Sequence, residues 1–150
     1  MLLTIFITIL ALSMPTSAMS DSSEIEVCEI YREKAAELSC TNQNYLIQFG
    51  YRYCRTYVIN EYRFLPETQQ VLSALRGCLA NDVKNDVALT CQTSEERAMA
   101  SHLECYVQSG FCEVDAFDKV MIFSIAAKEL NRKSFRKTMG EVASACVARD

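Results

Sequence analysis

The sequence contains few turn-forming residues and almost no histidine. It has four glycines, two prolines and one histidine in 150 residues. An all-β fold of many short strands needs more turn-forming residues than this, so the composition argues against one. With His102 as the only histidine and no CxxC pair in the chain, the common structural zinc sites are also excluded. The apolar residues are spaced as in helices instead.

The first 18 residues differ from the rest of the chain. Leu2 to Leu12 is an apolar run without charge, and Pro15 and small residues up to Ala18 follow it. This pattern is typical of a cleaved signal peptide, and the run is too short for a membrane anchor. We therefore expect a secreted protein whose residues 19–150 form a single domain with no membrane span. Its net charge of −4 argues against nucleic acid and anionic membrane surfaces as partners.

Eight cysteines lie in the expected mature chain. Their even number and the oxidising compartment that a signal peptide implies favour four disulfides. Residue types and spacing alone leave 105 pairings open. The cysteines are Cys28, Cys40, Cys54, Cys78, Cys91, Cys105, Cys112 and Cys146.

Apolar residues recur at steps of three and four through this domain, which predicts an all-α fold. The fold class is a compact, disulfide-linked array of about six to seven helices. Ser23 and Thr93 each begin a capping-box sequence, Pro66 suits a first helical turn, and Gly110 suits a helix end. The expected helices cover about 24–39, 43–63, a third from Pro66, 82–90, a fifth between Thr93 and Gly110, 115–130, and a seventh from near Ser134.

Catalytic signatures are weak. The stretch 102–106 is superficially similar to the active-site helix of secreted phospholipase A2, but Leu103 stands where that family has a calcium-binding Asp, and no Gly-rich loop precedes it. No GxSxG elbow accompanies His102 for a serine hydrolase. We interpret His102 as a surface histidine on a helix, and we expect no enzyme activity, no cofactor and no metal.

Two groups of residues are candidates for partner contact. Aromatic residues crowd into 45–64 on more than one helical face, and Tyr51, Tyr53 and Tyr57 are the candidate partner-binding residues, because exposed tyrosines are enriched at interfaces. The other interpretation is a core with an amphipathic rim. The basic residues between Arg132 and Lys137 form either a solvated face or a contact for an acidic partner or a sulfated glycan.

The cysteine spacing resembles that of the stanniocalcin family of secreted glycoprotein hormones. Twenty-three residues separate Cys54 from Cys78, thirteen separate Cys91 from Cys105, and six separate Cys105 from Cys112, as in that family. The stretch 75–83 and the triplet 104–106 are also similar to family segments. The likeness covers about residues 28–146.

The resemblance implies a pairing and a function. It implies the disulfides Cys28–Cys40, Cys78–Cys105 and Cys112–Cys146. It also implies Cys54–Cys91, because the family partners of these two cysteines have no counterpart here. The family's dimer-forming cysteine and N-glycosylation site are absent as well, so a homodimer would be non-covalent.

The first hypothesis is thus a secreted, stanniocalcin-like signalling or inhibitory protein that acts by contact with an extracellular protein or receptor. The second is a secreted helical carrier of small apolar ligands, which needs an internal pocket of a few hundred Å³. The third, a small hydrolase, has little support from a chain with one histidine.

Overall fold

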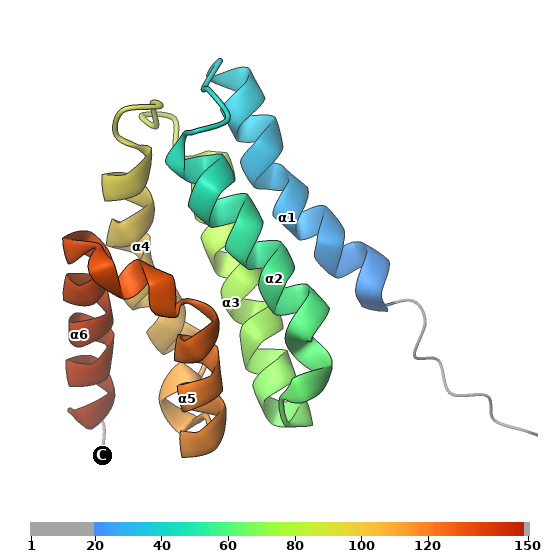
Figure 1. Cartoon of the computed structure of the whole chain (residues 1–150), viewed down its shortest axis with the longest axis vertical. Helices are drawn as coiled ribbons and strands as arrows, with labels where there is room; N and C mark the ends of the chain where they lie inside the picture. The colour runs from blue at the N-terminus through green and yellow to red at the C-terminus, as the bar shows by residue number, and fades with distance from the viewer. Residues whose placement is uncertain (1–19, 149–150) are drawn as a thin grey trace, which may run out of the picture.

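The computed structural model describes residues 20–148, and the predicted signal peptide 1–18 lies outside this range. The described residues form six α-helices and four short helical turns and contain no strand, which confirms the all-α prediction (Figure 1). The α-helices are α1 (Ser20–Glu37), α2 (Arg52–Asn60), α3 (Pro66–Asn85), α4 (Ser94–Gln108), α5 (Ala116–Ile125) and α6 (Lys133–Val147). The short turns are η1 (Leu46–Tyr51), η2 (Glu61–Arg63), η3 (Phe111–Glu113) and η4 (Ala127–Asn131).

Several local predictions are confirmed. Pro66 is the first residue of α3, where its missing N–H has no helical acceptor to lose. Gly110 follows α4 with φ +86°, a left-handed conformation that favours glycine. At the start of α5, a cap that the sequence analysis did not predict is formed by Asp115, which accepts a hydrogen bond from the backbone N–H of Phe117.

Other local predictions are wrong. No helix covers 82–90, because α3 continues to Asn85 and the chain then turns, with the Asp86 carboxylate accepting from the N–H of Ala88. Ser23 lies inside α1, so it does not cap the helix. Thr93 precedes α4 but its hydroxyl bonds to Thr90 instead of capping.

The predicted helices 43–63 and 115–130 are each divided. The first consists of the π-helical turn η1, then α2, then η2, and it starts only after the Asn44 side chain accepts from the N–H of Leu46. The second changes from α5 to the 3-10 turn η4 at Ala126. This change lets the Glu129 side chain accept a buried hydrogen bond from the Tyr53 hydroxyl, at 2.8 Å.

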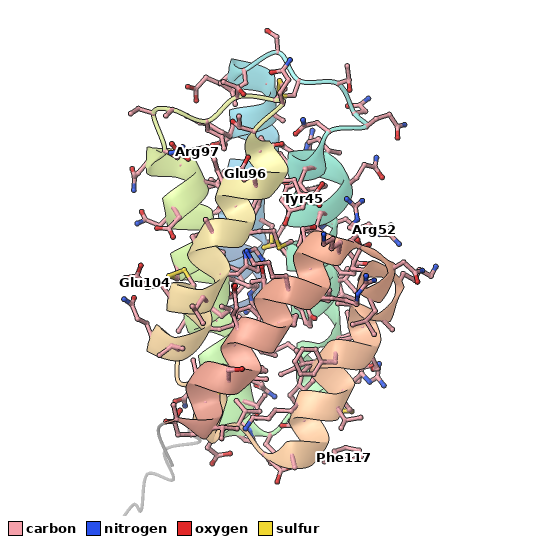
Figure 2. All side chains as sticks on the ribbon, turned by 90° about the vertical axis from the view of Figure 1, so that its left-hand side faces the viewer. Tyr45, Arg52, Glu96, Arg97, Glu104 and Phe117 are labelled. Atoms are coloured by element: carbon pink, nitrogen blue, oxygen red, sulfur yellow. A yellow bond between two sulfur atoms is a disulfide. The ribbon has the colours of Figure 1, made fainter. Side chains whose placement is uncertain are left out.

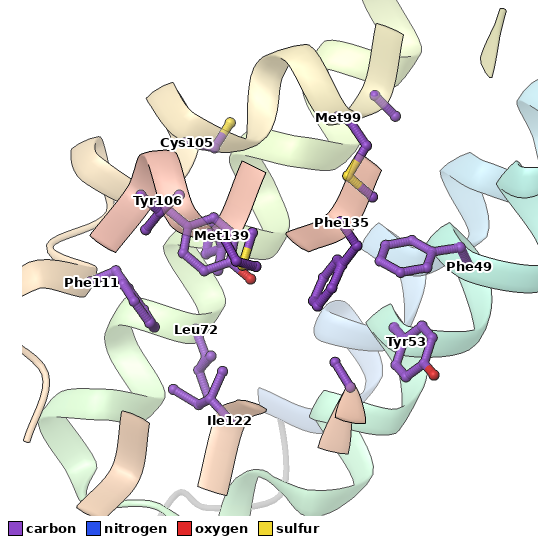
Figure 3. Close-up of a cluster of buried hydrophobic side chains, with 14 of the residues drawn as sticks. Phe49, Tyr53, Leu72, Met99, Cys105, Tyr106, Phe111, Ile122, Phe135 and Met139 are labelled. Atoms are coloured by element: carbon purple, nitrogen blue, oxygen red, sulfur yellow. The ribbon is translucent and has the colours of Figure 1, made fainter. Parts of the chain in front are cut away.

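Helix α3 lies between two apolar clusters. It contacts α1 on one side and α4 on the other, while α6 packs on α4 (Figure 1). The smaller cluster joins α1, η1, α2 and α3, and the larger joins η1, η3 and the helices α2 to α6. Figure 3 shows Phe49, Phe135 and Ile122, from three different elements, in the larger cluster.

The aromatic ring of Tyr31 on α1 packs directly against Gly50 in η1. A Cβ atom built on Gly50 would overlap this ring. The π-helical turn that contains Gly50 therefore brings its backbone directly against an aromatic ring. Any side chain at this position would push α1 away from η1.

Candidate functional site

Four disulfides crosslink the helices and the loops between them. All eight cysteines are paired, as predicted, with Cα–Cα distances of 5.0 to 5.6 Å. Cys78–Cys105 joins α3 to α4, and Cys112–Cys146 joins η3 to α6. These two bridges are the ones that the family resemblance implied.

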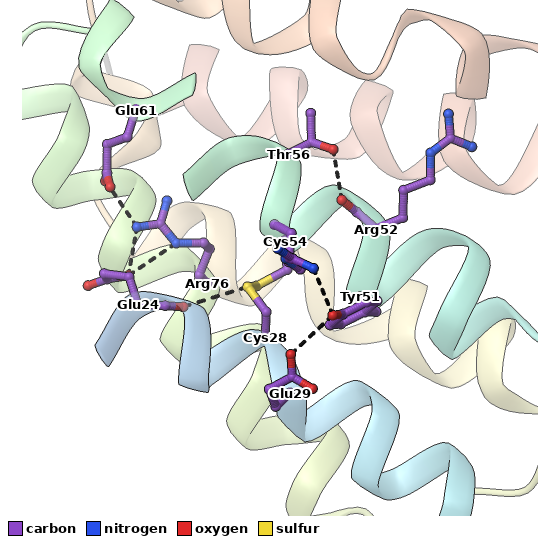
Figure 4. Close-up of a disulfide and its surroundings, with 10 residues drawn as sticks. Glu24, Cys28, Glu29, Tyr51, Arg52, Cys54, Thr56, Glu61 and Arg76 are labelled. Carbon is purple, nitrogen blue, oxygen red and sulfur yellow. Dashed lines mark hydrogen bonds and ion pairs between the residues drawn. A yellow bond between two sulfur atoms is a disulfide. The ribbon is translucent and has the colours of Figure 1, made fainter. Parts of the chain in front are cut away.

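The other two implied bridges are wrong. Cys28 pairs with Cys54, which joins α1 to α2, and Cys40 pairs with Cys91, which joins two loops (Figure 4 shows the first). Nine residues of α1 follow Cys28 and carry the chain roughly 14 Å along the helix axis before Cys40 is reached. A disulfide needs its Cα atoms within about 7 Å, so Cys28 takes a partner beside it on α2.

The three candidate tyrosines do not form one exposed face. Tyr53 is buried and donates to Glu129, so it is not available for partner contact in the folded protein. Tyr57 is half-buried, and its hydroxyl donates to the carbonyl oxygen of Ile122 at 2.8 Å. Tyr51 is also half-buried, and its hydroxyl lies between Glu29 and Arg55 (Figure 4). Their prediction as a contact face is therefore corrected to core and rim positions.

The basic residues at the start of α6 mostly have partners within the chain. Arg132 pairs with Glu95 and Glu129, and the Nζ atom of Lys137 lies 3.8 Å from the carboxylate of Glu141. Arg136 donates to the carbonyl oxygen of Leu130 at 2.6 Å. This arrangement favours the interpretation as a solvated face over a site for an acidic partner.

His102 is buried, so the expectation of a surface histidine is wrong. Its ring packs near those of Phe49 and Tyr106, and its Nδ1 lies 2.6 Å from the carbonyl oxygen of Ala98. Because a carbonyl only accepts, the neutral ring carries its proton on Nδ1, which leaves Nε2 as an acceptor. Burial lowers the pKa of His102 below its usual 6.5, since the charged ring would lose its hydration.

An internal cavity of about 70 Å³ lies where the two apolar clusters meet. Side chains from α1, η1, α2, α3, α4, α5 and α6 line it, including Tyr31, Tyr45, His102 and Tyr106. This volume is less than the few hundred Å³ that a carrier of apolar ligands needs. It is more than the roughly 10–15 Å³ that one water molecule needs, so the cavity has room for water.

Two polar atoms in side chains that line the cavity have no partner among the described residues. They are the Tyr45 hydroxyl and the Nη1 atom of Arg76, and both side chains are more than nine-tenths buried. The remaining Arg76 nitrogens donate to Glu24 and Glu61, at 2.7 to 3.2 Å (Figure 4). A buried polar group without a hydrogen bond costs about 1–3 kcal/mol, so a partner that residues 20–148 do not supply would stabilise these two atoms.

Apart from Arg76, burial favours the neutral forms of the titratable side chains that line the cavity. It raises the pKa of Tyr45 well above its usual value and that of Tyr106 to about 12. The Arg76 charge is balanced by Glu24 and Glu61. Desolvation raises the pKa of Glu24, but the hydrogen bonds from Ser73 and Arg76 outweigh it and hold this pKa below its usual value. The cavity therefore presents neutral donors and acceptors within an aromatic wall.

A second space, a surface groove of about 400 Å³, lies between the C-terminal half of α3 and the first half of α4. Its rim carries an ion pair between Asp86 and Arg97, in which Arg97 Nη2 lies 2.7 Å from Asp86 Oδ1. Val83, Ala98 and Ser101 line both the groove and the internal cavity. The two spaces are thus separated at this point by three small or medium side chains.

Asp82 lies beside the Cys78–Cys105 disulfide, and its carboxylate oxygen and the two sulfur atoms lie within 4.8 Å of one another. Both sulfurs are bonded to each other, and metal coordination needs a thiolate. The geometry therefore gives no metal site here while the disulfide is intact.

The outer face of α5 is apolar and exposed. Phe117 and Val120 are each 68% exposed, and they lie three residues apart on one side of the helix (Phe117 is at the lower end of Figure 2). Leu65, also exposed, lies next to α5, because its backbone N–H donates to the buried carboxylate of Asp118 at 3.0 Å. We call the two exposed side chains Phe117 and Val120 the α5 face. Sequence reasoning missed it, although α5 is apolar around most of its circumference.

Comparison with protein-family models, with curated proteins and with solved structures finds no match. Among the described residues, no helix has the length and apolar character needed to cross a bilayer. Four disulfides are compatible with an oxidising, extracellular environment.

Proposed function

We propose that this chain is a secreted signalling or inhibitory protein that acts by non-covalent contact with another extracellular protein. It would be stanniocalcin-like in this respect. The apolar leader in the sequence and the four disulfides support secretion. The resemblance in cysteine spacing supports a hormone-like role, with two of the four implied bridges present.

The exposed α5 face carries this proposal. A surface helix normally turns its apolar side chains inward and its charged ones outward, whereas α5 exposes Phe117 and Val120. Neighbouring exposed apolar side chains mark contact surfaces, and phenylalanine is enriched in interfaces. The α5 face replaces Tyr51, Tyr53 and Tyr57 as the proposed contact surface, and its partner is an extracellular protein that offers an apolar groove.

A contact function requires no catalytic group, and the surroundings of His102 agree with that. Its Nδ1 is directed to the carbonyl of Ala98, and its ring neighbours are aromatic. In this proposal His102 is a packing residue, and the chain is not an enzyme.

The experiment places a photo-crosslinking phenylalanine analogue at position 117 of the oxidised protein. A matched probe at position 87 serves as the control, since Val87 is 99% exposed but lies in the turn after α3. After irradiation in native extracellular fluid, mass spectrometry identifies proteins that crosslink at 117 and not at 87. The affinity of the identified partner is then measured for the wild type, Phe117→Ser/Val120→Ser and Val87→Ser.

We expect the double variant to bind at least tenfold more weakly and Val87→Ser to bind like the wild type, because buried apolar anchors dominate binding energy. Equal affinity of all three proteins would contradict the α5 face as the contact surface. Crosslinking of the chain to itself, together with dimers in sedimentation equilibrium that the double variant abolishes, would instead assign the face to a non-covalent homodimer.

A further inference from the structure

We propose that the internal cavity and the α3–α4 groove form one binding site for a small, neutral, hydroxyl- or carbonyl-bearing aromatic molecule, whose polar head lies in the cavity. This site is separate from the α5 face, and the proposal does not depend on contact with a protein partner.

The unpartnered polar atoms indicate that the cavity is a site. The Tyr45 hydroxyl and Arg76 Nη1 are buried, have no partner among residues 20–148, and belong to side chains that line the same cavity. Buried polar groups are almost always hydrogen-bonded in folded proteins. Water can fill this need in the free protein, and a ligand oxygen can replace that water where it forms the same hydrogen bonds.

The wall of the cavity selects a neutral head group. Arg76 already faces two carboxylates, Glu24 and Glu61, so an added anion would be repelled by them. The tyrosine hydroxyls can donate or accept, and the Nε2 atom of His102 can accept. A hydroxyl or carbonyl oxygen matches this set, and the aromatic rings of Tyr31, Tyr106 and their neighbours favour an aromatic body.

The volumes of the cavity and the groove indicate where the rest of the ligand would lie. The cavity of about 70 Å³ holds a head group but not a complete aromatic molecule. Val83, Ala98 and Ser101 line both spaces, so the cavity and the groove adjoin here, and rotation of the Val83 and Ser101 side chains would widen the connection between them. The head then lies beside Tyr45, and the body extends past Ala98 and Ser101 toward the groove of about 400 Å³.

The test uses three probes of nearly equal shape with the full, oxidised protein. Benzyl alcohol has the polar head, ethylbenzene replaces its hydroxyl by a methyl group, and benzoate adds a charge. Amide chemical shifts are followed by NMR during each titration. We expect benzyl alcohol to give saturable shifts at residues 98–102 and to bind at least tenfold more tightly than ethylbenzene or benzoate, because a site that bonds a hydroxyl rejects analogues without one.

Tyr45→Phe removes only the unpartnered hydroxyl, and Tyr62→Phe is the matched control at an exposed position. We expect Tyr45→Phe to bind benzyl alcohol about tenfold more weakly than the wild type. The variant should still bind neutral probes more tightly than benzoate, and Tyr62→Phe should bind like the wild type. Thermal unfolding of both variants verifies that they fold. Equal binding of benzyl alcohol and ethylbenzene, or no saturable shifts because the cavity holds water only, would overturn the proposal.

Discussion

Gly50 determines how closely α1 and η1 can pack. In sequence it looks like a weak point in a helix, since glycine lowers helix stability by about 1 kcal/mol relative to alanine. In the structure, the ring of Tyr31 occupies the space of its missing side chain. The periodicity of one segment cannot show this, because the reason lies on a different helix.

Gly50→Ala is therefore expected to destabilise the protein by about 2–3 kcal/mol, as overpacking of a core does. Gly77→Ala is the control, because a Cβ atom at Gly77 in α3 would meet nothing within 4 Å apart from its chain neighbours and the nearby backbone of its own helix. There alanine should stabilise by up to about 1 kcal/mol through its helix propensity. Chemical denaturation measures the free energy of unfolding of both variants. If Gly50→Ala were as stable as Gly77→Ala, the close packing of Tyr31 on Gly50 would be contradicted.

His102 gives a pH dependence that the sequence did not suggest. Its pKa is lowered in the folded protein by burial, so the unfolded chain binds a proton more readily than the folded chain. Neutral, buried His102 therefore stabilises the folded protein fully above pH 6.5, the approximate pKa of histidine in the unfolded chain. This contribution is lost as the pH falls from about 6.5 toward the lower pKa of the folded protein. His102 is the only histidine in the chain, so it dominates the linkage in this window.

We expect the free energy of unfolding to fall by up to about 1.4 kcal/mol between pH 7.5 and 5.5, the limit set by protonation of the unfolded histidine alone. His102→Gln should remove most of this slope, although it lowers stability overall. Urea unfolding across this pH range provides the measurement. A slope that stays the same in His102→Gln would mean that other groups cause it.

Among the helices, the best predictions come from local chemistry. Pro66 and Gly110 mark true helix boundaries, because the fixed φ of proline and the positive φ of glycine act within a few residues. The division of 115–130 into α5 and η4 was not predictable, because the bond between Glu129 and Tyr53 spans 76 residues of sequence. Likewise, the exposure of the α5 face depends on how the other elements of residues 20–148 are arranged around α5, and not on the pattern of α5 itself.

Arg76 connects three elements, since its guanidinium on α3 pairs with Glu24 on α1 and Glu61 in η2 (Figure 4). Removing one partner of a buried ion pair leaves the others desolvated and unpaired. Arg76→Met is expected to destabilise the protein by about 2–4 kcal/mol. This is less than the loss expected for a fully buried ion pair, because both glutamates retain some exposure to water.

Arg97→Met breaks the pair with Asp86 at the exposed rim of the groove and is the matched control. It should have a much smaller effect, because water screens exposed pairs. Thermal or urea unfolding of both variants gives the comparison. Similar losses of unfolding free energy in the two variants would contradict the claim that the buried Arg76 stabilises the protein by pairing with Glu24 and Glu61.

At the scale of the whole molecule, the sequence was sufficient for the fold class and for the participation of all eight cysteines. It was not sufficient for the pairing, because pairing depends on which helices lie side by side. Cys28 and Cys54 meet across α1 and α2, and Cys40 and Cys91 meet where two loops come together. The resemblance in cysteine spacing correctly predicted only the two bridges in the second half of the chain, Cys78–Cys105 and Cys112–Cys146.

The arrangement of helices is thus the central claim, and non-reducing tryptic mapping tests it directly. Cleavage after Arg32, Arg52, Arg55 and Arg97 separates the four cysteines concerned. We predict that peptide 53–55 is linked to the peptide ending at Arg32, and that peptide 35–52 is linked to peptide 85–97. A link between 53–55 and 85–97, which would join Cys54 to Cys91, would contradict this arrangement.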